Sequence, residues 1–251
     1  MIMNLYDAAD TGNLEKVQLL VEQGADKDQT AGNFGWSPIF AASRKGHVGV
    51  VHYLVQQGTD KDKVESSGWT CLYAASRNGH FAVVQCLVEQ GADMEKADND
   101  GWTPLMIASF RGHLDLVRYL LEQGANRDKT SISRMTSLHI AALNGHLEIT
   151  KLLMVYGADL NARTNDGQLP IDMGHRNNDE IKQAIHDEPR RRMDEAPGKR
   201  CSVASASAQR DDEDEEEEQS NKRPRLDEGA EKVAEEDEDS DPSSNEEGED
   251  D

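Results

Sequence analysis

The sequence predicts an all-α fold, in which helix-turn-helix units with β-turn fingers stack into a solenoid and a disordered tail follows. Two observations predict the solenoid: a Gly-Trp pair returns every 33 residues, and a Gly-His pair returns at the same period. A fixed period of this length is typical of repeat architectures. One observation predicts the tail, because no aromatic residue follows Tyr156. The Gly-Trp and Gly-His pairs begin at Gly35, Gly68 and Gly101, and at Gly46, Gly79, Gly112 and Gly145.

The period divides residues 1–186 into six units. A single pair of short helices cannot bury its apolar face, so the units must stack to form a continuous core. One extra residue falls before Gly35, because Gly24 precedes Gly58 by 34 residues. The units are an N-terminal capping unit at 1–33, full units at 34–66, 67–99, 100–132 and 133–165, and a degenerate cap at 166–186.

The first helix of each full unit is predicted from the residues at its two ends. A hydroxyl residue stands at the N-cap, where its oxygen can accept a hydrogen bond from a helix amide. Pro38 and Pro104 follow at the first helical position, which needs no amide hydrogen. The helix ends at the glycine of Gly-His, which adopts a left-handed conformation without steric cost. The N-cap residues are Ser37, Thr70, Thr103 and Thr136.

The second helix of each unit is predicted from apolar residues at helical spacing. Leu114, Val117, Leu120 and Leu121 lie on one face of such a helix. The neighbouring units repeat the pattern with Val48, Val51, Leu54 and Val55, and with Leu147, Ile149, Leu152 and Leu153.

Together, the period, the tetrapeptides "TPLM" at 103–106 and "TSLH" at 136–139, the Gly-His pairs and the Gly-Ala-Asp triplets resemble the ankyrin repeat over about residues 1–186. The histidine of the family tetrapeptide is present only as His139; Phe40, Tyr73 and Met106 replace it. We therefore expect the hydrogen bond that this histidine makes to be missing from most units. Arg134 stands where the other fingers have glycine.

The resemblance implies a binding surface on a shared concave side, formed by the fingers and one face of each first helix. Three tryptophans there would offer roughly 600 Å² of mostly apolar surface, about the largest patch that a monomer leaves in water. Aromatic residues and arginine are typical of binding hot spots. An alternative is that the indoles lie flat on neighbouring fingers and stiffen them. The candidate partner-binding residues are Trp36, Trp69, Trp102, Arg44, Lys45, Arg77, Asn78, Phe110 and Arg111.

Metal binding and catalysis find no support in the spacing of reactive residues. The four Gly-His histidines would lie in a row about 8–10 Å apart, so they cannot converge on one tetrahedral ion. We expect them to bond backbone groups between units instead. Cys71 and Cys86 resemble small buried residues, and no glycine-rich phosphate loop is present. The sequence therefore predicts a non-enzyme with no catalytic residue, no metal and no cofactor.

Residues 187–251 are predicted to be a disordered acidic tail. They contain 26 acidic and 10 basic residues, whereas residues 1–186 contain 23 and 17. Such a segment lacks the apolar area that offsets the entropy of folding. A nuclear import signal is resembled by the basic cluster Lys222, Arg223, Pro224 and Arg225. We therefore expect the protein in the nucleus, with or without a further pool in the cytoplasm.

Two functions from different classes fit these features. The first is a non-enzymatic adaptor, expected to be a monomer, that binds a protein partner through the concave ankyrin face. The second is a histone-chaperone-like activity, in which the acidic tail binds basic nuclear proteins. A net charge of -22 opposes direct DNA binding. No signal sequence or membrane span is expected, and three cysteines without a CxxC pair favour a reducing compartment.

Overall fold

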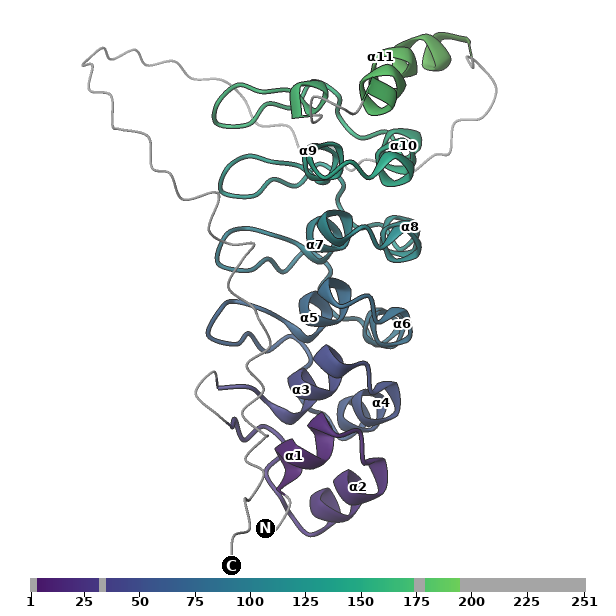
Figure 1. Cartoon of the computed structure of the whole chain (residues 1–251). Coiled ribbons are helices and arrows are strands. Elements are labelled where there is room, and N and C mark those ends of the chain that lie inside the picture. Colours follow the sequence, from purple (N-terminus) through teal and green to yellow (C-terminus); the bar gives the residue numbers. More distant parts are fainter. Residues whose placement is uncertain (1–3, 32–34, 174–178, 195–251) are drawn as a thin grey trace, which may run out of the picture. The chain divides into compact units, whose positions relative to one another are not determined.

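The computed structural model describes residues 4–31, 35–173 and 179–194, with side chains up to Asp187. In this part of the chain five pairs of short helices stack in order, and no strand occurs, so the predicted all-α fold is confirmed (Figure 1). The expected disordered tail from residue 195 on and the basic cluster Lys222, Arg223, Pro224 and Arg225 lie outside the described residues.

The helices form two rows (Figure 1). The first helices pack on one another in order, and so do the second helices. The finger loops project beyond the first row. The first row is α1 (Leu5–Asp10), α3 (Pro38–Lys45), α5 (Cys71–Arg77), α7 (Pro104–Arg111), α9 (Ser137–Leu143) and the 3-10 helix η1 (Pro170–Met173). The second row is α2 (Leu14–Glu22), α4 (Val48–Gln56), α6 (Phe81–Glu89), α8 (Leu114–Glu122), α10 (Leu147–Val155) and α11 (Asp179–Asp194).

The core repeats at the same period as the sequence. One leucine from each of the four second helices between α4 and α10 is fully buried, at Leu54, Leu87, Leu120 and Leu153. Burying one such side chain contributes about 1.5–3 kcal/mol. Because each side chain is enclosed by its own unit and its neighbours, the units stabilise one another and not only themselves.

The N-cap prediction holds at three of the four first helices. The side-chain oxygens of Thr70, Thr103 and Thr136 accept hydrogen bonds from amides in the first turn. Ser37 occupies the same position but makes no such bond. Its hydroxyl and amide both donate to Glu65 Oε1, at 3.0 and 3.3 Å, so a carboxylate at the start of the next finger along the chain holds this helix start instead.

The Gly-His pairs join consecutive units, as expected. His80 Nε2 lies 2.8 Å from the carbonyl oxygen of Arg44, and His113 Nε2 lies 3.1 Å from that of Arg77. A Cβ on Gly79, whose φ is +77°, would lie only 2.8 Å from the His113 ring. Glycine is therefore required twice, by the left-handed turn and by the close approach of the ring. The same bond joins His47 to Asp10 and His146 to Phe110, each at 2.9 Å.

The last unit departs from the expected boundary. Its first helix is the short 3-10 helix η1, whose start is held by Asp172, which accepts a hydrogen bond from the Leu169 amide at 2.9 Å. Ile181 and Ile185 of α11 are buried in the core, and α11 packs on α10. The helix continues to Asp194, beyond the predicted end of the repeats at residue 186. The added segment is rich in charged residues, so apolar periodicity did not mark it.

Arg134 is the one residue other than glycine with a positive φ among the described residues. Its φ of 58° places it in the left-handed region, where the hairpin glycines of the other fingers lie. An L-residue there costs about 1–2 kcal/mol. The fourth full unit therefore carries strain in its finger that the other units avoid.

We predict that Arg134→Gly raises the free energy of unfolding by about 0.5–1 kcal/mol, because relief of strain exceeds the added chain entropy of glycine. Urea denaturation of the full-length chain measures this change. The matched control is Gly167→Arg, at the equivalent finger position of the last unit, where φ is +76° and no atom lies within 4 Å of an added Cβ; it introduces the same strain and should lower stability. Equal or lower stability of Arg134→Gly would contradict the assignment of strain.

Candidate functional site

The three finger tryptophans, Trp36, Trp69 and Trp102, are half-buried, and we call them, with the residues that cover them, the tryptophan row. The Trp36 ring centroid lies 5.5 Å from that of Phe40. The Trp69 centroid lies 5.3 Å from that of Tyr73. Both partners lie in the first helix of the same unit, so each indole fixes its finger to its own helix.

Arginines cover the first two indoles. The guanidinium carbon of Arg44 lies 4.6 Å from the centroid of Trp36, and that of Arg77 lies 4.6 Å from the centroid of Trp69. Cation–π attraction over tryptophan, the best aromatic partner, contributes about 0.5–1 kcal/mol at exposed sites and more where water is excluded. Two consecutive units thus present the same preorganised pair of a cation and an indole.

In the third full unit an aromatic ring replaces the covering arginine. Phe110 meets Trp102 nearly edge to face, with centroids 5.5 Å apart and an interplanar angle of 78°. Arg111 lies over Phe110 at 5.5 Å, so the positive charge is displaced by one residue. The fourth unit continues the row with a half-buried Met135 and with Leu143, which is 39% exposed. The row therefore changes from cationic and aromatic to apolar along the stack.

Charge separates the first helices from the rest of the repeats. Helices α3, α5 and α7 contain four basic residues and no acidic one, although residues 1–186 are net acidic. The basic residues stand in the last turn, where cations also stabilise the helix dipole. Lys45, Asn78 and Arg111 are exposed, whereas Arg44 and Arg77 are half-buried against their indoles. The structure thus brings all nine candidate residues to the fingers and the ends of the first helices.

A hydrogen bond between the Tyr73 hydroxyl of α5 and the Asp98 carboxylate of the next finger links a helix to a finger, and the sequence analysis did not predict it. Asp98, four residues before Trp102, accepts bonds from the amides of Trp102 and Asp100 at 2.8 and 3.0 Å. The Tyr73 hydroxyl donates to the same carboxylate. Burial raises the pKa of Asp98, and the bonds from Trp102 and Tyr73 oppose that rise.

Replacing the tetrapeptide histidine was expected to remove its bond, and Phe40 and Met106 indeed offer no hydrogen-bond donor, but Tyr73 makes a different bond. In the fourth unit His139 Nε2 lies 3.3 Å from the Gln168 carbonyl of the next finger, and burial lowers the pKa of this histidine. In the second unit the Tyr73 hydroxyl reaches the next finger in its place. The available signal was positional, because Glu65 and Asp98 stand 33 residues apart, each four residues before the tryptophan of its finger, Trp69 or Trp102.

We predict that Tyr73→Phe lowers the free energy of unfolding by about 1–2 kcal/mol, because a carboxylate loses a charge-assisted hydrogen bond. The pKa of Asp98 should also rise, since the Tyr73 bond holds it down. Urea denaturation and carbon-detected NMR titration of the carboxyl measure the two changes. Tyr53→Phe removes the same atom from α4 and serves as the control. An unchanged Asp98 pKa would exclude the proposed link.

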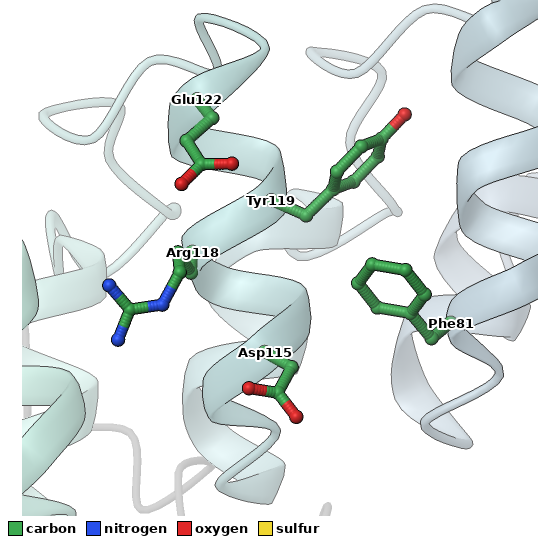
Figure 2. A pocket seen from close by; sticks show the side chains of 5 residues that line it. All are labelled: Phe81, Asp115, Arg118, Tyr119 and Glu122. Carbon is green, nitrogen blue, oxygen red and sulfur yellow. The ribbon is translucent and has the colours of Figure 1, made fainter.

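A shallow hollow lies between α6 and α8 of the second row of helices (Figure 2). Its volume is about 290 Å³, and it is lined by Phe81 and by one face of α8. The rings of Phe81 and Tyr119 meet edge to face with centroids 5.4 Å apart. Sequence reasoning did not single out either ring, because Phe81 stands at the helix start, where the other units also carry apolar residues, Val48, Leu114 and Leu147. The α8 residues are Asp115, Arg118, Tyr119 and Glu122.

Reactive groups in the described residues offer no assembled chemistry. Cys71 is 1% exposed, and burial raises the pKa of its thiol to about 12, so it is a poor nucleophile. Within residues 4–31, 35–173 and 179–194, no three metal-ligating side chains of His, Cys, Asp or Glu gather at one point. In the same part of the chain, every helix is too short or too polar to span a bilayer.

Comparison with known proteins agrees with the geometry of the stack. A family model for ankyrin repeats in three copies matches residues 5–98 and 87–164. These matches span more than half of the chain and include all of the tryptophan row. A search of curated proteins finds no match.

Proposed function

The chain belongs to the ankyrin-repeat family, and from this premise we propose that it is a non-enzymatic adaptor that binds a protein partner through the tryptophan row. Ankyrin repeats generally serve protein–protein interaction, and proteins built from them are typically interaction modules and not enzymes. Fold alone does not name a partner, so the proposal depends on the surface.

The observation that carries the proposal is the repeated pairing of arginine with indole. Arg44 on Trp36 and Arg77 on Trp69 have the same geometry in consecutive units. Tryptophan and arginine are the residues most enriched in binding hot spots. Side chains already held in place lose less entropy on binding, which otherwise costs about 0.5–1.5 kcal/mol for each long side chain.

A purely structural role for these residues is the alternative to be tested. Each indole packs on its own helix, so removing it also removes packing. Each arginine stands in the last helical turn, where its charge stabilises the helix end by about 0.3–1 kcal/mol. A binding role therefore requires an effect on partner affinity that exceeds the effect on stability.

We predict that Trp69→Ala and Arg77→Glu each reduce partner capture by the immobilised full-length chain about tenfold or more, equivalent to about 1.4 kcal/mol. Quantitative mass spectrometry of captured proteins measures the loss, and thermal unfolding of each variant gives its stability. The matched control is Arg118→Glu, the same charge reversal on the exposed face of α8. A parallel loss of capture and melting temperature, or an equal loss with Arg118→Glu, would remove the binding role.

The acidic tail is a second candidate, carried by the unbroken run of eight acids from Asp211 to Glu218. The negative charge of such a run would attract basic proteins such as histones. A chain that ends at residue 194 retains all of α11 and separates the two candidates in the same capture experiment. The adaptor keeps its main partner after this truncation, whereas the tail-based activity loses it.

We also propose that the protein acts in the nucleus, supported by the basic residues Lys222, Arg223 and Arg225. We predict that replacing these three residues with alanine moves a fusion to tandem fluorescent proteins from nucleus to cytoplasm, because import receptors read clustered positive charge. Fluorescence microscopy measures the nuclear fraction. Replacing Lys199 and Arg200 with alanine is the control. A nuclear fraction unchanged by the triple substitution would rule this signal out.

A further inference from the structure

We infer that the partner segment is an extended, polyproline-II-like stretch that presents two carboxylates three residues apart, followed at the same spacing by apolar side chains. The inference rests on the proposed function, since it specifies what the tryptophan row binds. Three features carry it: the spacing of the units, the order of side chains along the row and the placement of charge.

The spacing of the units selects the backbone conformation of the partner. Neighbouring packed helices lie about 8–10 Å apart. A polyproline II segment has three residues per turn and rises about 3.1 Å per residue, so every third side chain faces the same way, about 9 Å from the last. Side chains on one face of a β-strand are about 6.6 Å apart, which does not match. A polyproline II segment therefore offers one side chain to each unit.

The order of side chains along the row selects the partner's chemistry. The first two full units present Arg44 and Arg77, each stacked by its face on an indole. A guanidinium stacked in this way keeps its N–H groups in the plane around its edge, which is how arginine pairs with carboxylates. The next two units present Phe110 and Leu143 at the same place in the repeat. The matching order is anionic, anionic, apolar, apolar.

Two carboxylates of the fingers, the buried Glu65 and the half-buried Asp98, accept hydrogen bonds from other groups. Glu65 accepts two hydrogen bonds from Ser37, and Asp98 accepts bonds from two finger amides. Asp10 of α1 stands at the position in the capping unit that Arg44 occupies in the first full unit. The basic part of the row therefore begins at the first full unit. Attraction of an anionic segment is thus local, and salt should weaken it.

Two synthetic peptides test the inference against the full-length chain by isothermal titration calorimetry. They are Ac-EPPEPPLPPLP-amide and its reverse order, Ac-LPPLPPEPPEP-amide, which together test both directions of the bound segment. We expect one of them to bind about tenfold or more tightly than its counterpart with lysine for glutamate, a difference of about 1.4 kcal/mol. Its affinity should also exceed that of a counterpart peptide whose glutamates are only two residues apart. Raising NaCl from about 50 to about 500 mM should weaken its binding.

Variants of the row locate the bound peptide. We expect Arg44→Glu and Arg77→Glu each to weaken the preferred peptide about tenfold, and the double variant to prefer the lysine peptide. Arg118→Glu on α8 should leave the affinity unchanged. Arg44→Gln and Arg77→Gln remove charge without reversing it, so they provide the same comparison if a reversal disturbs folding, which circular dichroism detects.

Failure of this inference is distinct from failure of the proposed function. If neither peptide binds more tightly than its lysine counterpart, or if binding survives the arginine substitutions, the inferred chemistry is wrong. The proposed function still stands in that case when Trp69→Ala abolishes partner capture. If capture does not depend on the row, the proposed function falls, whatever the peptides do.

Discussion

The stack depends on one hydrogen bond, made by each Gly-His histidine to a carbonyl of the preceding unit. His80 bonds the carbonyl of Arg44, and His113 bonds that of Arg77. The same two arginines lie over the indoles of Trp36 and Trp69. The bond that holds neighbouring units together therefore also fixes the backbone from which the binding surface extends. It also requires glycine in the preceding unit, because a Cβ on Gly46 would meet the ring of His80.

Contacts between helices and fingers keep their function while their chemistry changes. His139 reaches a carbonyl of the next finger, Tyr73 reaches a carboxylate, and Ser37 receives a carboxylate in a unit where Phe40 offers no polar group. Each of these three bonds gives a partner to a polar group at the interface. Leaving such a group buried without a partner costs about 1–3 kcal/mol. Side chains in a repeat protein can therefore diverge strongly as long as each interface remains satisfied, and this freedom allows the surface to differ from unit to unit.

The tryptophan row and the outer hollow show two different uses of aromatic surface. In the row, arginines cover the indoles of Trp36 and Trp69, so positive charge and apolar area occur together. In the hollow, Phe81 and Tyr119 meet edge to face beside both acidic and basic residues of α8, and no charge dominates. Only the row combines a repeated geometry with a single sign of charge in its helices, and this combination gives it the stronger basis for recognition.

The sequence by itself determined the repeat period, the order of the helices, most of their caps and the left-handed glycines, because these depend on residues close together in the chain or at a strict period. Only the tertiary structure decided that Arg44 covers Trp36, that Glu65 holds Ser37 and that Tyr73 bonds Asp98. It also decided that α11 continues to Asp194. The three side-chain contacts join different segments of the chain, and each depends on side-chain conformations and distances that exist only once the units have packed.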